Sequence, residues 1–333
     1  MNSLLLKDKK LNTLKIKKTN EEDDRIIQRL KSKNEIHVIF LCDWKDSEVN
    51  LEELKMYTPN NLGIYGKLVG TSNLKLADIV IFLENIPKNF KKLLVDKLVI
   101  CYPREPHTIN KSKPWEKLKY KYGFTYDNIY HVFADPKFLN RSYDYLSNLN
   151  YDNTSKIKKL SAIVSGKSRT EGHFIRKKFM INLSNKFEDN IDIFGGKWND
   201  ELNEKSYKGE LGFYHDEKNT KNSKFEGLAN YEYSLCIENV QTKNYFTEKF
   251  TDCILCNTIP IYYGCNNISE YFPKDSFYTF DINDSKACDV IEEIIKKPIT
   301  EENILALKKA KDLILNKYNI WSTTEDILNN YLK

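Results

Sequence analysis

The sequence lacks a long hydrophobic run. Between Met1 and Lys18 its only apolar run is Leu4–Leu6, whereas a helix that spans a bilayer needs about 20 consecutive apolar residues. We therefore expect no transmembrane segment in this part of the chain. Peripheral contact with a membrane is left open.

Regularly spaced cysteines are also missing. The seven cysteines are odd in number and follow no framework, which fits scattered buried thiols better than a disulfide scaffold. Cys253 and Cys256 form a C-x-x-C pair, but no second cysteine or histidine pair accompanies it. A zinc site is therefore not expected, and we interpret both thiols as core residues on the apolar face of a helix.

Two motifs of metal-dependent and nucleotide-hydrolysing enzymes are absent. No Asp-x-Asp pair occurs, and the nearest approach, Asn190–Asp192, begins with a neutral amide. Gly166–Ser168 resembles the end of a phosphate-binding P-loop, but Ser161 stands where that loop needs its first glycine. We expect neither a metal site nor nucleoside triphosphate hydrolysis.

The balance of charge is only slightly basic. The formal net charge is +5 over 333 residues, and acidic residues are dispersed among the basic ones, so charge alone does not predict nucleic-acid binding. The lysines at 7–18 and 156–159 lack interleaved aromatic residues. Nucleic-acid binding therefore ranks last among the functions considered. The slightly basic charge remains compatible with a small anionic ligand.

Apolar strands alternate with helical patterns in two successive units, which indicates parallel α/β sheets. The predicted organisation is a polar arm at 1–34, either loose or an exposed helix, a first α/β domain at 35–152, a second at 158–298, and C-terminal helices at 300–333. We expect strands at 37–42, 78–83, 97–101, 160–164, 191–194, 231–237, 258–264 and 276–280, and helices at 170–185, 247–257, 290–295, 301–317 and 323–332.

Reactive side chains gather where the strand at 231–237 ends and the next helix begins near Thr247, a good N-cap residue. A helix N-terminus offers unpaired N–H groups and a partial positive charge, so a diphosphate can bind there. Lys249 adds a full charge, and Glu248 can accept hydrogen bonds from ribose hydroxyls. The same residues also fit an ordinary first helical turn, and Glu238 with Asn239 fits a simple turn cap.

This stretch resembles the α-1,3-fucosyltransferases of glycosyltransferase family 10. The strand ending in Ile237-Glu238-Asn239, the run Asn244–Lys249 and the strand Thr258–Gly264 match that family in order and spacing, and the likeness extends from Tyr231 to about Asp281. Ile237 stands where phenylalanine is usual, Asn244 where aspartate is common, and Asn257 where a small residue often occurs. The resemblance implies a GT-B fold, with two Rossmann-like domains facing across a cleft.

The resemblance also implies the donor site. In the family an arginine of the helix that follows the first strand of the second domain binds the donor diphosphate, and Arg176 fits by spacing, with Arg169 as the nearer rival. The implied donor-binding residues are Arg176, Asn239, Tyr245, Glu248 and Lys249, with Glu238 and Thr247 as further candidates. No metal or other cofactor is required by this arrangement.

The catalytic base is expected in the loop after the strand at 97–101, because ligands bind beyond the carboxyl ends of strands in open α/β sheets. Bacterial family members place a glutamate there, which corresponds to Glu105. His107, with an unperturbed pKa of about 6.5, is the alternative base. Glu105 equally fits an exposed ion pair with Arg104.

The predicted activity is inverting transfer of L-fucose from GDP-β-L-fucose to a hydroxyl of an oligosaccharide acceptor, in α-1,3 linkage. The alternatives are a non-catalytic carbohydrate- or nucleotide-binding protein of the same fold and a transferase that uses another GDP-sugar. Without a visible anchor, the resemblance points to a cytoplasmic enzyme of bacterial or viral type. The sequence leaves the acceptor and the oligomeric state open.

Overall fold

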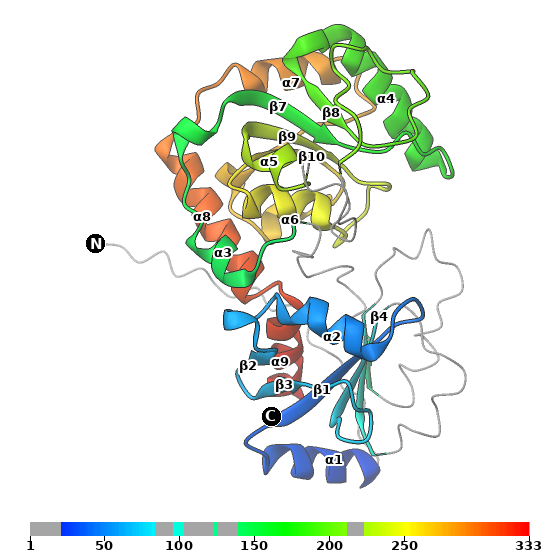
Figure 1. The fold of residues 1–333 in the computed structure, drawn as a ribbon, viewed down its shortest axis with the longest axis vertical. Coiled ribbons are helices and arrows are strands. Elements are labelled where there is room, and N and C mark those ends of the chain that lie inside the picture. Colours follow the sequence, from blue (N-terminus) through cyan, green and yellow to red (C-terminus); the bar gives the residue numbers. More distant parts are fainter. Residues whose placement is uncertain (1–20, 84–95, 103–122, 126–138, 212–222, 333) are drawn as a thin grey trace.

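Two α/β units follow one another along the chain and stack along the long axis of the molecule (Figure 1). The computed structural model describes residues 21–83, 96–102, 123–125, 139–211 and 223–332. Among these residues, no helix is long and apolar enough to cross a membrane.

The first unit is built on a six-stranded sheet with the order β2-β3-β1-β4-β5-β6. All neighbouring strands are parallel except β2 and β3, which are antiparallel. β4 and β5 are buried along their whole length, which explains their continuous apolar sequence. The strands are β1 (Ile36–Leu41), β2 (Ile64–Tyr65), β3 (Leu68–Gly70), β4 (Ile79–Leu83), β5 (Leu98–Tyr102) and β6 (Gly123–Thr125).

The second unit is built on a five-stranded parallel sheet with the order β11-β10-β9-β7-β8. Its strands are β7 (Lys158–Ile163), β8 (Asp192–Phe194), β9 (Tyr231–Ile237), β10 (Ile259–Tyr263) and β11 (Tyr278–Thr279). The described α-helices are α1 (Glu21–Lys31), α2 (Ser47–Lys55), α3 (Tyr143–Asn148), α4 (Glu171–Phe187), α5 (Glu226–Ala229), α6 (Glu248–Leu255), α7 (Ala287–Ile295), α8 (Glu301–Asn316) and α9 (Ile320–Tyr331). Short 3-10 helices lie at Pro59–Asn61, Asn153–Ser155, Glu188–Asn190, Ile268–Glu270 and Lys274–Ser276.

The predicted α/β class, with two largely parallel sheets, is confirmed. Each predicted strand corresponds to an observed one, most of them within two residues at each end. The short strands β2, β3 and β6 and the helices α2, α3 and α5 were not predicted, whereas a helix in the N-terminal arm was one of two alternatives. Residues 21–31 of the predicted polar arm form α1, which packs on the first unit because Ile26 and Leu30, one helical turn apart, are buried in its core.

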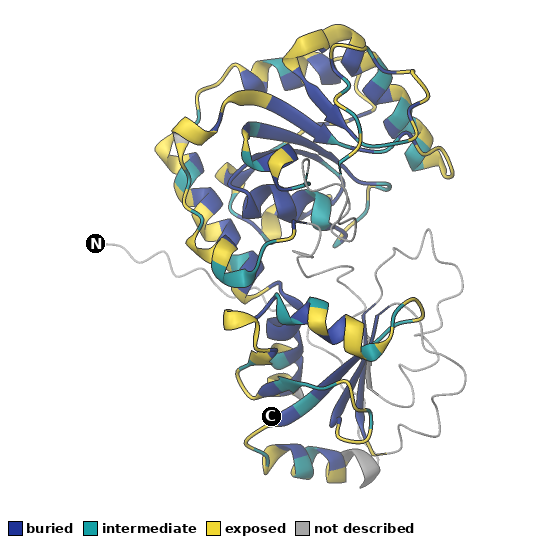
Figure 2. Cartoon of the chain, viewed as in Figure 1, coloured by how far each residue is buried: buried dark blue, intermediate teal, exposed yellow. Residues whose placement is uncertain are grey.

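The last two helices pack on different units. α8 packs on the second unit against α6. α9 instead lies within the first unit, where Figure 2 shows a largely buried helix. Trp321 is 0% exposed there, and its Nε1 donates a hydrogen bond to the carbonyl of Leu54 at 2.9 Å. The final helix therefore completes the core of the unit that begins the chain.

Candidate functional site

The carboxyl end of β9 and the N-terminus of α6 meet at one edge of the second sheet. Thr247 is the N-cap of α6, as predicted, and its side chain accepts a hydrogen bond from the amide of Lys249 at 3.3 Å. The first turn of α6, which carries the positive end of the helix dipole, therefore faces the end of β9. Such an arrangement favours an anion.

Glu238 fixes the position of this helix start. Its carboxylate is 0% exposed and accepts hydrogen bonds from the Thr247 amide at 2.8 Å and the Thr247 hydroxyl at 2.8 Å. Gly264 leaves room for it, because a Cβ there would lie 2.5 Å from Glu238 Cγ. The side chain of Glu238 thus faces into the protein and positions α6.

Lys249 is the cation at this edge. Its Nζ lies 3.2 Å from Glu238 Oε2 and 3.5 Å from Glu248 Oε1, and the side chain is 23% exposed. Burial acts to lower the pKa of Lys249, but the two carboxylates outweigh it, so that the pKa is raised. The ammonium is therefore charged at neutral pH, with part of its surface available to a ligand.

Arg176, from the second turn of α4, reaches the same place. Its Nη1 donates to Asn239 Oδ1 at 2.6 Å and to the carbonyl of Ile237 at 3.4 Å. The residue is only 4% exposed, and its buried Nε has no hydrogen-bond partner. Burial lowers the pKa of Arg176, and the Glu238 carboxylate opposes that shift. A guanidinium held this way remains charged and has donors left for an anion.

The close approach of α4 to β9 depends on a glycine that the sequence reasoning missed. A Cβ on Gly172 would lie 1.7 Å from the carbonyl oxygen of Asn239, so any other residue there would push the two elements apart. Gly172 lies four residues before Arg176, which was the available signal in the sequence. No local pattern, however, predicts that Gly172 packs against Asn239.

His173 is a second residue that the sequence reasoning missed. Its Nδ1 lies 2.6 Å from the hydroxyl of Thr170, the N-cap of α4. Burial and four nearby cations lower its pKa: Arg176, Lys167, Lys249 and Arg169. The lowered pKa favours the neutral imidazole at pH 7.

The loop between β9 and α6 explains one departure from the family pattern. Asn244 adopts a left-handed backbone with φ 61°, a conformation that asparagine tolerates well. Its Oδ1 accepts hydrogen bonds from Asn267 Nδ2 at 2.7 Å and from the Tyr271 hydroxyl at 2.8 Å. Tyr245 follows it and is 2% exposed, so this side chain is part of the site's interior.

Seven of the predicted site residues are thus brought together: Arg176, Glu238, Asn239, Tyr245, Thr247, Glu248 and Lys249. Arg169 lies apart from them, in a basic pocket at the ends of β7 and β8. Glu105 and His107, the predicted base and its alternative, lie outside the described residues, as does Arg104.

On the first unit, Trp44 is an exposed aromatic side chain that the sequence reasoning did not single out. It lies three residues after β1, beyond the carboxyl end of that strand, and is 48% exposed. Exposed aromatic residues at such an edge suit contact with a ligand.

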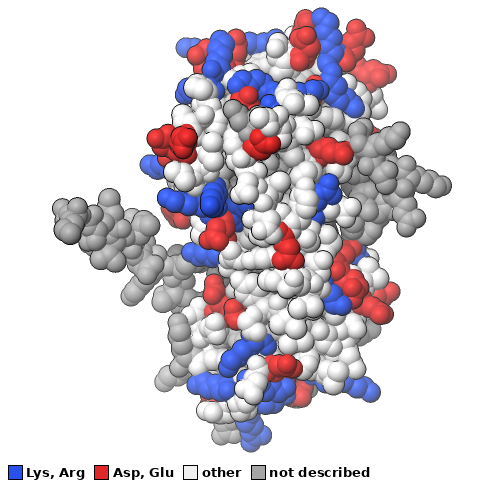
Figure 3. Space-filling view, turned by 60° about the vertical axis from the view of Figure 1, so that its left-hand side comes forward, with Lys and Arg blue, Asp and Glu red and all other residues white. Residues whose placement is uncertain are grey.

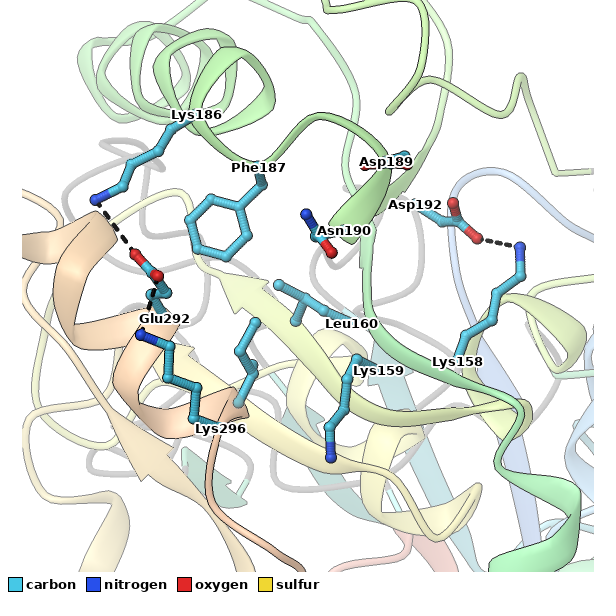
Figure 4. A pocket seen from close by; sticks show the side chains of 11 residues that line it. Lys158, Lys159, Leu160, Lys186, Phe187, Asp189, Asn190, Asp192, Glu292 and Lys296 are labelled. Carbon is cyan, nitrogen blue, oxygen red and sulfur yellow. Dashed lines mark hydrogen bonds and ion pairs between the residues drawn. The ribbon is translucent and has the colours of Figure 1, made fainter.

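A further pocket lies at the other edge of this sheet. A pocket of about 590 Å³ lies at the amino ends of β7 and β8, the opposite edge of the second sheet (Figure 4). Its lysines are neutralised by carboxylates, for example Lys158 by Asp192 at 2.5 Å and Lys296 by Glu292 at 3.0 Å. We assign the site to the other edge, because the N-terminus of α6, the buried Arg176 and the partly exposed Lys249 converge there.

Within the described ranges, we find neither a cluster of metal ligands nor a basic face that would indicate a metal site or a nucleic-acid site. These residues contain no group of three His, Cys, Asp or Glu side chains that could hold a metal ion. Cys253 and Cys256 are each 1% exposed in the core, as predicted. On the face shown in Figure 3, positive and negative side chains are interspersed.

Comparison with known proteins agrees with this geometry. Residues 153–303 match the C-terminal domain of glycosyltransferase family 10 (fucosyltransferase). The chain is 37% identical over 98 residues to the alpha-(1,3)-fucosyltransferase FucT of Helicobacter pylori, an alignment that covers 29% of this chain and 19% of that enzyme. The chain thus spans about a fifth of that relative's length.

Solved structures extend the likeness to both units. The crystal structure of an alpha1,3-fucosyltransferase superposes with a TM-score of 0.52 at 19% identity, covering 91% of each chain. An alpha-glucosyltransferase solved with UDP-glucose and DNA containing an abasic site superposes with a TM-score of 0.51 at 11% identity, covering 89% of this chain and 100% of that one. Both similarities show the fold, which is GT-B. Within residues 153–303, the chain is similar to the C-terminal domain of glycosyltransferase family 10, the fucosyltransferases.

Proposed function

We propose that this protein transfers L-fucose from GDP-β-L-fucose to a hydroxyl of a glycan acceptor, with inversion at the anomeric carbon and in α-1,3 linkage. The observation that carries the proposal is the convergence of Arg176, Lys249 and the α6 N-terminus at the end of β9. Arg176, Lys249 and the positive end of the helix dipole can each contact a sugar-nucleotide diphosphate at this place.

The same groups would stabilise the leaving group. As the acceptor oxygen bonds to the anomeric carbon, the bond from that carbon to the β-phosphate oxygen breaks and GDP gains negative charge. Arg176 and Lys249 are already oriented by Asn239 and Glu238, so little reorganisation is needed when this charge develops. No step in this scheme uses a metal ion.

The remaining roles follow the resemblance. Glu105 takes the proton of the attacking hydroxyl, with His107 as the alternative base. Glu248, beside Lys249, holds the ribose. The acceptor binds on the side of the first unit, where Trp44 offers an exposed aromatic surface.

A donor panel tests the proposal. The protein is incubated with GDP-fucose, GDP-mannose or UDP-glucose and a set of neutral and acidic oligosaccharides, and products are identified by mass and by NMR of the new linkage. We expect fucosylated product from GDP-fucose alone, with the α configuration. Product from another GDP-sugar only would favour a transferase of different donor specificity. Tight GDP binding without transfer from any donor would favour the non-catalytic alternative.

A further inference from the structure

A second positive site lies on the same edge of the second sheet, beyond the carboxyl ends of β7 and β8. It is a pocket of about 250 Å³ whose lining includes four basic residues. Its lining residues are Gly166, Lys167, Ser168, Arg169, Lys177, Lys197 and Asn199.

Most of this positive charge has no carboxylate partner among the described residues. Lys177 is paired with Glu201, but Lys167, Arg169 and Lys197 make no ion pair with any residue in the described ranges. In the pocket of Figure 4, by contrast, lysines such as Lys158 and Lys296 are paired with carboxylates. Converging like charges raise the energy of the folded protein, so an external anion is the natural complement.

The backbone around this pocket is held in one conformation. Lys197 and Asn199 have left-handed backbones, with φ of 69° and 50°. Between them Trp198 is buried, and its Nε1 donates to the carbonyl of Val164 at 3.1 Å. A Cβ on Gly166 would lie 2.2 Å from the carbonyl oxygen of Lys197. The two loops are therefore locked together, which distinguishes these cations from lysines on a loose surface.

The pocket is a neighbour of the donor site. β7, whose end carries Lys167 and Arg169, pairs directly with β9, whose end carries Glu238 and Asn239. His173 lies within electrostatic range of cations from both places. A group bound in the pocket would therefore be close to the sugar-nucleotide.

The donor has no charge left for this pocket. The charge of GDP-fucose resides in its diphosphate, which Arg176, Lys249 and α6 are placed to neutralise. We propose that the pocket of Lys167, Arg169 and Lys197 binds an anionic group of the acceptor, so that the preferred substrate is an acidic glycan carrying a carboxylate, sulfate or phosphate. This inference rests on the proposed fucosyl transfer.

The binding test uses inorganic sulfate as the probe. The parent protein is saturated with GDP, so that the diphosphate site is occupied, and titrated with sulfate by calorimetry at constant ionic strength. We expect saturable binding that Lys167→Ala and Lys197→Ala each weaken about tenfold, while the GDP affinity of both variants stays that of the parent. The control is Lys205→Ala, which removes an exposed lysine paired with Glu188 and should change neither affinity.

The kinetic test compares an oligosaccharide with its sialylated, sulfated and phosphorylated forms. The proposal predicts a higher kcat/KM for at least one acidic form, and about a tenfold loss of that preference in each pocket variant, with transfer to the neutral form unchanged. The form preferred identifies the anionic group.

The inference is overturned if GDP-saturated protein binds no sulfate, if the variants lose GDP affinity, or if they affect neutral and acidic acceptors equally. Failure of the proposed function is a different result: no fucose is transferred to any acceptor, whereas the sulfate titration still reports on the pocket.

Discussion

At the scale of single residues, the site depends on a buried carboxylate that supports the ligand-binding groups. Glu238 accepts hydrogen bonds from Thr247 and contacts Lys249 at 3.2 Å while it is itself inaccessible to solvent. Its effect on a donor would be exerted through the position of α6 and the orientation of Lys249.

Replacing Glu238 by Gln tests this role. The amide would place an NH₂ group against the donors of Thr247 or Lys249, and we expect a loss of about 3–5 kcal/mol in the free energy of unfolding, as for other broken buried pairs. Urea denaturation measures it. Glu293→Gln, at an exposed ion pair with Lys296, is the control. A loss below about 1 kcal/mol would show that the carboxylate is not needed to hold α6.

The base is tested by Glu105→Gln. Removal of a general base lowers the rate by roughly 10²–10⁴, and because this residue lies within the predicted first domain, at 35–152, we expect GDP affinity to be unchanged. Transfer rates and GDP calorimetry on the same sample separate the two effects. Activity within a few-fold of the parent would point to His107 as the base.

The sequence could predict the roles of those residues whose contacts are with their near neighbours in the chain. Thr247 was predicted as an N-cap because capping depends on neighbouring residues alone. The inward direction of Glu238 and the contact between Arg176 and Asn239, which are 63 positions apart, depend on how β9, α4 and α6 pack. Gly172 and His173 were missed for the same reason.

At the scale of the secondary-structure element, α6 has a defined environment at both ends. Its N-terminus faces the candidate donor site, and at its C-terminal end the buried Lys156 donates to the carbonyl of Cys256 at 3.2 Å. The buried Lys311 of α8 donates to the carbonyl of Leu149 at 2.7 Å. Burial lowers the pKa of both lysines to about 8.

These two lysines predict a pH dependence of stability. Between about pH 8 and 10.5 each of these lysines is protonated in the unfolded chain and deprotonated in the folded protein, so their contribution to the free energy of unfolding rises with pH. Buried thiols such as Cys256, whose pKa burial raises, contribute in the opposite direction. Urea denaturation at several pH values measures it. Relative to the parent, the double variant Lys156→Met with Lys311→Met should lose this positive contribution to the slope of stability against pH, whereas Lys308→Met, at an exposed position of α8, should keep the parent's slope. An unchanged slope in the double variant would contradict this assignment.

Element prediction succeeded where the pattern was long and apolar. β4, β5 and β9 are buried along most of their length and were found from continuous apolar runs. β2 has two residues and β3 three, too few for any period, and they exist because they pair with each other and with β1.

At the scale of the whole molecule, the two units are tied together by the end of the chain. α9 contributes Trp321 to the core of the first unit, where its ring packs edge-on against Phe40 at 5.0 Å between centroids. Asn319, the N-cap of α9, donates to the carbonyl of Tyr57 at 2.9 Å. The sequence predicted the helix but left its partner open, since amphipathic spacing does not say which surface a helix covers.

Trp321→Ala should therefore destabilise the unit at the opposite end of the sequence. We expect a loss of about 3–5 kcal/mol in the free energy of unfolding, as for other buried aromatic residues cut to alanine. Chemical denaturation measures the loss. Trp44→Ala, at an exposed position, is the matched control and should change stability little. An equal effect of the two variants would contradict the assignment of α9 to the first core.

GDP binding at the end of β9 is the central claim, and calorimetric titration of GDP tests it most directly. Arg176→Gln and Lys249→Gln should each weaken binding by about 1.5–3 kcal/mol, the range of charge-assisted hydrogen bonds. Arg169→Gln and the surface control Lys205→Gln should bind GDP like the parent. If Arg176→Gln and Lys249→Gln retain the parent's affinity, or if Arg169→Gln alone loses it, the donor site has been placed wrongly.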